Sequence, residues 1–143
     1  MMKLKTNSEA ETRALGKNLG AKLKGGEILA LAGNLGSGKT TFVKGLARGL
    51  GLRKKIKSPT FVIFQPYRIP DKKQGMFYHF DLYRLGSVKD LRELGFQEII
   101  SSAQNISVIE WPEKTKKKLP KRTIYLKFIH GRKENQRIIT FYA

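Results

Sequence analysis

The sequence predicts an α/β fold: a single P-loop domain over residues 1–143, in which helices flank a mixed sheet. Three observations predict it. Apolar runs typical of strands alternate with stretches whose apolar residues recur at helical spacing. A glycine-rich loop stands between the longest apolar run and a helical stretch. Hydrophobic residues make up 40% of the 143 residues, which is enough for one packed core.

The N-terminal part is predicted to form a helix, a strand, a loop and a second helix. An amphipathic helix is expected over residues 9–23, ended by Gly25 and Gly26, because its apolar residues have mixed three- and four-residue spacing. Those residues are Ala10, Ala14, Leu15, Leu19 and Leu23. The continuous apolar run Ile28–Ala32 is typical of a strand buried on both faces. Residues 39–50 predict the second helix, which Gly51 closes.

The rest of the chain is predicted to add strands and one more helix. Strands are expected at 61–64 and 76–80, with a polar turn over 65–75 between them. This connection is too tight for a helical crossover, so an antiparallel pair and a mixed sheet follow. Residues 88–100 are expected to be helical, with an interruption at Gly95. A buried strand at 106–109, a lysine-rich loop at 112–120 and strands at 124–129 and 137–141 complete the prediction.

Composition excludes several classes of protein. The chain has no cysteine, which rules out disulfides, zinc–thiolate sites and cysteine nucleophiles. Its longest apolar run is far too short to cross a bilayer, and the N-terminus lacks an apolar stretch of signal-peptide length. We therefore expect a soluble, cytoplasmic protein with no membrane partner.

The chain is strongly basic, with 29 Lys and Arg against 11 Asp and Glu, a net charge of +18. Residues 114–143 hold ten Lys and Arg and a single acid, Glu134. Such a surface attracts RNA or an acidic partner. Solvated, lysine-biased faces are the alternative, and we favour it, because the lysine cluster lacks the interleaved stacking aromatics of an RNA-binding module.

A phosphate-binding loop is the most specific motif. Residues Gly33-Asn34-Leu35-Gly36-Ser37-Gly38-Lys39-Thr40 fit the pattern G-x-x-x-x-G-K-[ST] between a buried strand and a helix. Backbone N–H groups of such a loop converge on phosphate oxygens at a helix N-terminus. Lys39 is expected at the surface, reaching the β- and γ-phosphates, and the Thr40 hydroxyl is expected to bind Mg²⁺. The motif thus predicts an ATP–Mg²⁺ site.

Two acids stand where a metal-binding carboxylate is needed. Asp81 and Glu110 each follow a predicted strand, and ligands of open α/β sheets bind at the carboxyl ends of strands. Either acid can bind Mg²⁺ directly or through water. An ion pair or a helix cap is the structural alternative for each. Arg84 fits an ion pair with Asp81 better than a charge-stabilising role, and His79 fits a core histidine better than a catalytic base.

Two further residues have open interpretations. Thr60, in Ser58-Pro59-Thr60, has the character of a switch threonine that senses Mg²⁺ and the γ-phosphate, or of a simple turn residue. Trp111 is the chain's only tryptophan. Its ring can cover an adenine or close the core.

Taken in order, these pieces resemble the TsaE family, the small ATPases of bacterial tRNA threonylcarbamoyladenosine synthesis. The similarity extends along nearly the whole chain. The P-loop is generic, whereas the spaced set of three other motifs is far more specific. These motifs are Ser58-Pro59-Thr60, His79-Phe80-Asp81-Leu82-Tyr83-Arg84-Leu85 and Glu110-Trp111-Pro112.

The resemblance implies roles for particular residues. The phosphates would be held by the P-loop, the metal by Thr40 with Glu110 or Asp81, and the base by Trp111 and the segment after it. Lys39, Asp81 and Thr60 would act in hydrolysis, with Thr60 and Asp81 coupling the γ-phosphate to the partner. Arg132 or Arg137 would close the site. The nucleotide-binding set is Gly33, Gly36, Ser37, Gly38, Lys39, Thr40, Thr41, Trp111, Glu113, Lys114, Thr115, Lys116, Lys117, Arg132 and Arg137.

The resemblance also implies partners and a reaction. Family members dock on the transferase subunits that modify a tRNA adenosine next to the anticodon, and they cycle nucleotide without transferring the group themselves. A tRNA contact through the basic surface is compatible with the charge. The family usually has an acid where this chain has Asn34, which implies slower hydrolysis with nucleotide binding unaffected.

Three other classes were weighed. A GTPase needs Asp-x-x-Gly and Asn-Lys-x-Asp motifs, and neither occurs here. A small P-loop kinase acting on a small molecule or nucleoside is the main alternative, but it needs an arginine-rich lid, and the polar stretch here is short and lysine-rich. A nucleic-acid-binding module that uses the loop only as an anion site is the third.

Overall fold

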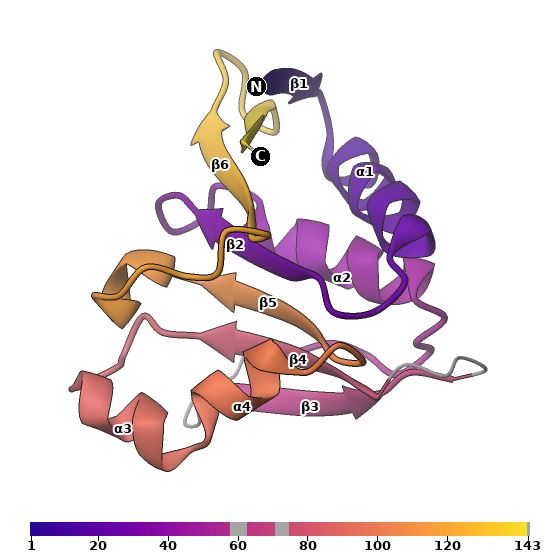
Figure 1. Ribbon diagram of the computed structural model, residues 1–143. Helices are drawn as coiled ribbons and strands as arrows, with labels where there is room; N and C mark the ends of the chain where they lie inside the picture. The colour runs from indigo at the N-terminus through magenta and orange to yellow at the C-terminus, as the bar shows by residue number, and fades with distance from the viewer. Residues whose placement is uncertain (58–62, 71–74, 143) are drawn as a thin grey trace.

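The computed structural model of the protein describes residues 1–57, 63–70 and 75–142, and it confirms the predicted fold class. One seven-stranded mixed sheet has the order β1-β7-β6-β2-β5-β4-β3 (Figure 1). Along the chain the elements are β1 (Met2–Thr6), α1 (Glu9–Lys22), β2 (Ile28–Ala32), α2 (Lys39–Gly49), β3 (Phe64–Arg68), β4 (Met76–Asp81), α3 (Val88–Glu93), α4 (Phe96–Ser101), β5 (Ile106–Glu110), the 3₁₀ turn η1 (Pro112–Thr115), β6 (Ile124–His130) and β7 (Arg137–Tyr142).

The centre of the sheet is parallel and its margins are antiparallel. Strand β2 lies between β6 and β5, parallel to both, and β5 is also parallel to β4. The pairs β6–β7, β7–β1 and β3–β4 are antiparallel. All residues of β5 and nearly all of β2 are buried, which explains their unbroken apolar sequences.

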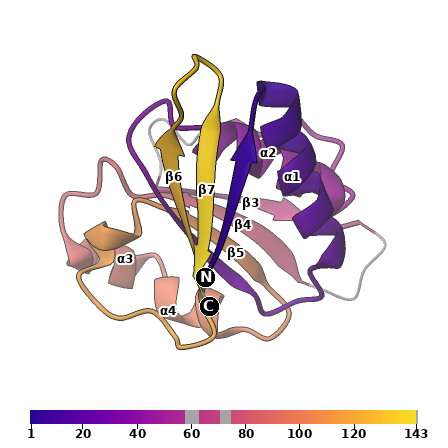
Figure 2. The ribbon, with the colours of Figure 1, turned by 90° about the horizontal axis from the view of Figure 1, so that it is seen from above.

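Helices cover the two faces unequally. Helices α1 and α2 pack on one face, where Phe42 of α2 meets Phe128 of β6 edge to face at 5.4 Å between ring centroids. Helices α3 and α4 cover the opposite face only over its β5-β4-β3 half (Figure 1), where Phe96 meets Phe80 at 5.0 Å. Viewed from above, α1 and α2 lie on the far side of β1 from α3 and α4 (Figure 2). None of the helices in the described residues combines the length and apolar composition that a membrane crossing requires.

Helix α1 occupies almost the predicted range but buries a different set of residues. It begins after the N-cap Ser8, whose side chain accepts a hydrogen bond from the Glu11 N–H. Its fully buried residues are Thr12, Gly16 and Gly20, whereas Ala10 and Ala14 are exposed. A Cβ on Gly16 would lie 2.2 Å from the Phe42 carbonyl oxygen, so glycine allows α1 to approach α2 closely.

The largest departures from prediction lie at the sheet edges. Residues 65–68, predicted as part of a polar turn, belong to β3, and Pro66 is tolerated because β3 is an edge strand. The predicted strand residues Phe61 and Val62 lie outside the described residues. Strand β1 was not predicted. At Gly95, with φ of 76°, the predicted helix over 88–100 is divided into α3 and α4.

Candidate nucleotide-binding site

The carboxyl ends of three parallel strands meet at one edge of the sheet. Glu110, at the end of β5, is the register partner of Leu31 in β2 on one side and of Asp81 in β4 on the other. The glycine-rich loop leaves β2 at the same edge. The topology therefore places the two acids beside the loop, as the strand-end rule predicts.

The loop is shaped by glycines where no other residue fits. Gly33 has φ of 151°, and a Cβ there would lie 2.6 Å from the Phe128 carbonyl oxygen. Gly38 has φ of 102° and is the N-cap of α2, with no side chain capping the first turn. Gly38 therefore gives the first turn of α2 no N-cap side chain, and backbone N–H groups at a glycine-led helix N-terminus of this kind bind phosphate.

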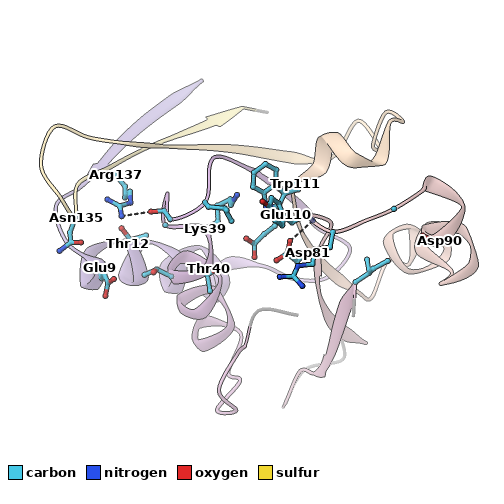
Figure 3. Close-up of a pocket in the computed structure, with 18 residues that line it drawn as sticks. Glu9, Thr12, Lys39, Thr40, Asp81, Asp90, Glu110, Trp111, Asn135 and Arg137 are labelled. Carbon is cyan, nitrogen blue, oxygen red and sulfur yellow. Dashed lines mark hydrogen bonds between the residues drawn. The ribbon is translucent and has the colours of Figure 1, made fainter. Parts of the chain in front are cut away.

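A cavity of about 800 Å³ opens against this loop. Lys39, Asp81, Glu110 and Trp111 gather around its middle, with Arg137 toward one end and Asp90 toward the other (Figure 3). The complete lining is Glu9, Thr12, Leu35, Gly36, Gly38, Lys39, Thr40, Thr41, Ile63, Asp81, Tyr83, Arg84, Gly86, Asp90, Glu110, Trp111, Asn135 and Arg137. A volume of this size matches ordinary small-molecule and cofactor sites.

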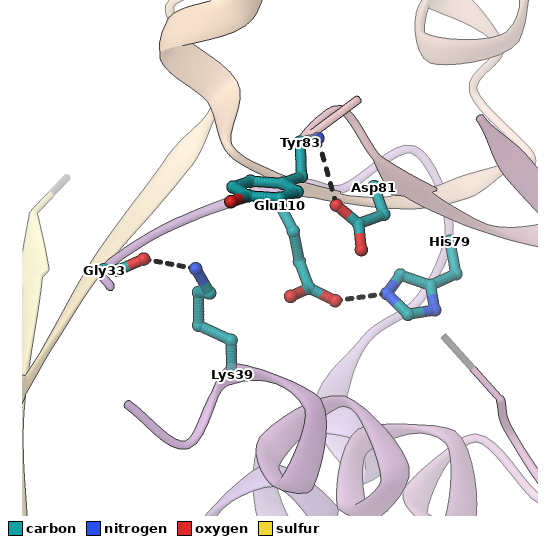
Figure 4. Close-up of polar contacts among 6 residues, drawn as sticks. All are labelled: Gly33, Lys39, His79, Asp81, Tyr83 and Glu110. Atoms are coloured by element: carbon teal, nitrogen blue, oxygen red, sulfur yellow. Dashed lines mark hydrogen bonds and ion pairs between the residues drawn. The ribbon is translucent and has the colours of Figure 1, made fainter. Parts of the chain in front are cut away.

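Lys39 is buried, and the expectation of a surface position was wrong. Only 4% of the residue is exposed. Its Nζ donates to the Gly33 carbonyl oxygen (Figure 4). The same atom lies 4.1 Å from the centroid of the Trp111 ring. Burial lowers the pKa of Lys39, and the nearby Glu110, Asp81 and Glu113 carboxylates oppose that shift. The amine is thus held inside the loop by its own backbone and by an aromatic face.

Glu110 is buried and held from behind by His79. The Glu110 Oε2 and the His79 Nε2 are 2.5 Å apart, and the histidine is fully buried on β4 (Figure 4). His79 does not line the cavity, so it is a core residue that orients Glu110. Its Nδ1 has no hydrogen-bond partner within the described residues.

Asp81 is the more exposed of the two carboxylates. Its Oδ1 accepts a hydrogen bond of 3.1 Å from the Tyr83 N–H. Burial raises the pKa of Asp81, and so does the Glu110 carboxylate, whereas the Tyr83 hydrogen bond, His79 and Lys39 act in the opposite direction. Arg84 lines the cavity, but among the described residues it forms no ion pair with Asp81, so that expectation was wrong.

Trp111 forms a wall of the cavity. The residue has φ of 60°, a left-handed conformation that turns the chain sharply after β5. Its ring packs against the Tyr83 ring at 4.9 Å between centroids and also touches the core cluster under α3 and α4. The ring therefore packs at the edge of the core, and its contact with an adenine stays a prediction.

The C-terminal strands supply one of the two predicted arginines. Arg137 donates to the Gly36 carbonyl oxygen at 3.0 Å, and its aliphatic part lies beside Gly38. Arg132 is exposed and does not line the cavity. The structure thus brings Arg137 to the loop and leaves Arg132 on the surface.

The segment after Trp111 borders the cavity without lining it. The Thr115 hydroxyl contacts the carbonyl oxygens of Pro112 and Lys117, at 2.9 and 3.0 Å, and so closes the turn η1. Glu113 lies close enough to Lys39 to influence its pKa, whereas Lys116 and Lys117 are exposed. The other predicted residue of this segment is the half-buried Lys114. Thr60 lies outside the described residues.

Sequence reasoning missed several lining residues. Glu9 and Thr12 come from α1, Asn135 from the β6–β7 connection and Asp90 from α3. No motif marks them, because they reach the cavity through the packing of α1, of α3 and of the β6–β7 hairpin around it. Tyr83 belongs to the His79–Leu85 motif, but the motif does not predict that its ring packs against Trp111.

The donor set fits a magnesium ion better than a metal held by protein alone. Within the described residues no group of three or more His, Cys, Asp or Glu side chains could hold a metal. Asp81 and Glu110 offer hard carboxylate oxygens, and Thr40 lines the same cavity. Mg²⁺ is usually bound by one or two carboxylates together with substrate phosphates, so these residues fit that ion.

The topology and the loop place the protein in the class of P-loop nucleotide-binding domains. Over residues 6–139 the sequence matches the family described as "Threonylcarbamoyl adenosine biosynthesis protein TsaE". A tRNA threonylcarbamoyladenosine biosynthesis protein TsaE from Treponema pallidum is 38% identical over 123 residues, 86% of this chain and 87% of that protein. The protein of the same name from Bacillus subtilis is 35% identical over 144 residues, which cover 99% of this chain and 85% of that protein.

A solved structure agrees with this match. The crystal structure of Bacillus subtilis YdiB superposes with a TM-score of 0.76 at 34% identity, covering 98% of this chain and 83% of that one. The chain belongs to the TsaE family, whose members take part in threonylcarbamoyladenosine biosynthesis, and the resemblance seen in the sequence is confirmed.

Proposed function

We propose that this protein binds ATP with Mg²⁺ at the P-loop and hydrolyses it, in the cytoplasm, in support of threonylcarbamoyladenosine formation next to the tRNA anticodon. The observation that carries the proposal is the register pairing of Asp81 with Glu110 beside the loop that holds Lys39. An anion cradle, a cation and two carboxylates at one edge of the sheet are what a metal–triphosphate complex requires.

Each residue has a proposed task at this edge. Backbone N–H groups of the loop and of α2 would hold the phosphates, with Gly33, Gly36, Ser37 and Gly38 permitting that shape. Lys39 would exchange its contact with the Gly33 carbonyl for phosphate oxygens. That exchange replaces a neutral acceptor by a charged one and so favours the protonated amine. Thr40 and Thr41 line the cavity at the first turn of α2.

The carboxylates would hold the metal in one of two arrangements. Glu110 is fixed by His79, whereas Asp81 is half-exposed and accepts a hydrogen bond from the Tyr83 N–H. A rigid Glu110 suits the direct ligand, and Asp81 suits a contact through water. Bound there, the ion would neutralise charge that develops on the transferring phosphoryl group.

The walls of the cavity would place the rest of the nucleotide. Trp111 lines the cavity and would cover the base. Glu113 and Lys114, in the turn that follows, would border the nucleotide. Arg137 already contacts the loop at Gly36 and would close the phosphate end. Thr60 would sense the γ-phosphate.

We further propose that hydrolysis is slow in isolation and increases when the protein docks on the threonylcarbamoyl transferase subunits. A P-loop site without a supplied stabilising cation can lose roughly 10³–10⁵ in rate. Asn34, which is exposed and does not line the cavity, adds no carboxylate that could orient a water. A docked subunit would supply the missing stabilising groups and order the site for hydrolysis.

The test of this function is complementation. Cells depleted of their own TsaE-family protein should regain tRNA threonylcarbamoyladenosine, measured in digested tRNA, when they express this chain. The Lys39→Ala variant should fail, although it accumulates to the same level. Loss of modification with the wild-type chain, or full restoration by Lys39→Ala, would contradict the proposal.

A further inference from the structure

Within the described residues, no helix lies against one face of the β1-β7-β6 half of the sheet (Figure 1). Side chains alternate along these strands, and Leu126, Phe128 and Ile139 point into the core under α1 and α2. The alternate residues therefore lie on the opposite face. Helices α3 and α4 lie over the other half of the sheet (Figure 1).

The register brings two tyrosines together on this uncovered face. Tyr125 of β6 is the direct partner of Tyr142 of β7, and they are 39% and 40% exposed. Two residues further along β6 stands the exposed Lys127, opposite Thr140. The next pair is Ile129, 44% exposed, and Ile138.

Strand β1 extends the same face with two more cations. Lys3 pairs with Thr140 and Lys5 with Ile138, so both lysines lie beside the tyrosine and isoleucine pairs. Both are exposed. The three strands contain no acidic residue, and within the described residues none of these lysines forms an ion pair. The outer face thus consists of the half-buried Ile138, the buried Thr140 and six exposed residues, which are Lys3, Lys5, Tyr125, Lys127, Ile129 and Tyr142.

We propose that this outer face binds a single-stranded segment of RNA. Two exposed aromatic rings on a sheet, beside cations that have no carboxylate partner, are the elements with which proteins bind unpaired nucleic acid. Bases stack on Tyr125 and Tyr142, while Lys3, Lys5 and Lys127 contact the phosphates. No sequence motif marks this arrangement, because the tyrosines are 17 residues apart and lie outside the lysine-rich loop.

RNA fits the outer face better than an acidic protein does. Charge alone would attract either. Exposed tyrosines at one end of the cationic patch add stacking surfaces, which every nucleobase can use and which acidic side chains cannot. The site is also separate from the nucleotide cavity, because none of its eight residues lines that cavity. RNA binding therefore goes beyond the proposed ATPase and does not depend on it.

Binding of a fluorescently labelled oligouridine, followed by anisotropy, tests the proposal. Tyr125→Ala and Tyr142→Ala should each weaken binding by about fivefold to a hundredfold, with little change in salt dependence. Tyr125→Phe and Tyr142→Phe should retain wild-type affinity, because the ring is kept. The triple variant Lys3→Gln/Lys5→Gln/Lys127→Gln should reduce the slope of log affinity against log salt by about 2, from roughly 0.7 per lost phosphate contact.

Two controls separate this site from general basicity and from the ATPase. The variant Arg13→Gln/Lys17→Gln/Lys22→Gln removes the same charge from exposed positions on α1 and should bind RNA much more tightly than the outer-face triple variant. Lys39→Ala should bind RNA like the wild type. Wild-type affinity in both Tyr→Ala variants would overturn the proposal. Equal losses of RNA affinity in the two triple variants would also overturn it. The same holds if the Tyr→Ala variants lose docking on the transferase subunits but keep their RNA affinity.

Discussion

The Nζ atom of Lys39 lies 4.1 Å from the centroid of the Trp111 ring while it donates to the Gly33 carbonyl oxygen. The amine that a P-loop directs at phosphate is here enclosed by the loop and by an aromatic face. We expect a triphosphate to draw this amine toward itself, because charged phosphate oxygens accept stronger hydrogen bonds from an ammonium group than a neutral carbonyl does. Trp111 therefore lies against the group that we propose to respond to nucleotide.

We predict that ATP changes the fluorescence of Trp111. It is the only tryptophan, so the signal belongs to this contact alone. Lys39→Met should shift the emission of the free protein, since the cation leaves the ring, and should abolish the response to ATP. Tripolyphosphate should also produce a response, because the amine moves with the phosphates. Emission that stays constant at saturating ATP would show that Lys39 does not leave the ring.

We predict that Asp81→Asn stabilises the nucleotide-free protein at neutral pH. The pKa of Asp81 is raised above 3.8 by burial, so the folded state disfavours its ionised form. That destabilisation is fully present above the folded-state pKa and disappears as the pH falls through that pKa toward 3.8. The asparagine can still accept from the Tyr83 N–H.

Thermal unfolding across pH checks this expectation. Asp81→Asn should melt higher than the wild type at neutral pH, with the two curves converging in acid. With Mg²⁺ and ATP present, the difference in melting temperature between Asp81→Asn and the wild type should become smaller or change sign. Only the wild type gains the metal contact, and that contact stabilises its folded state. A variant that melts lower than the wild type at neutral pH without nucleotide would refute the burial argument.

We predict that Gly45→Ala destabilises the fold through α1. A Cβ at Gly45 would lie 1.9 Å from the Arg13 carbonyl oxygen, which is backbone and cannot turn aside. Separating two packed helices to admit a methyl group costs about 1–3 kcal/mol. Gly86→Ala is the matched control, because its nearest atom is the Asp90 carboxylate at 3.6 Å, and it should change stability by less than about 0.5 kcal/mol. Equal denaturation midpoints for the two variants would contradict the close α1–α2 packing.

We predict that the transferase subunits increase the ATPase rate of this protein and that added salt reduces the increase. The net charge of +18 favours an acidic docking face, and such encounters are screened by salt. Thr60→Ala should reduce the stimulation more than it reduces ATP affinity. Steady-state hydrolysis with and without the subunits measures both. A fast rate in isolation that the subunits leave unchanged would favour the kinase alternative.

Much of the site was predictable because it depends on local sequence. The P-loop is specified by glycine spacing and by the strand and helix beside it, and Asp81 and Glu110 were identified by their places at strand ends. The pairing of Asp81 with Glu110 follows once the two strands are parallel neighbours. These are rules of chain geometry that operate within a few residues.

The features that were missed depend on distant contacts. Burial of Lys39 requires Trp111 to fold back over the loop, and the orientation of Glu110 by His79 requires the register of β4 against β5. Strand β1 alternates lysine with half-exposed apolar residues and becomes a strand because β7 offers it an edge. The predicted ion pair between Arg84 and Asp81 was wrong for the opposite reason. The two residues are close in sequence, but the fold does not bring their charged groups together.

The central claim is that Glu110 holds a metal ion against phosphates bound at the P-loop. Calorimetric titration of ATP into wild-type and Glu110→Gln protein, with and without Mg²⁺, tests it most directly. Glutamine keeps the shape of the side chain and a hydrogen bond to His79, so the fold should persist. We predict that Mg²⁺ tightens ATP binding to the wild type and that Glu110→Gln loses this gain while keeping its Mg²⁺-free affinity. A Glu110→Gln variant that retains the full Mg²⁺-dependent gain would contradict it.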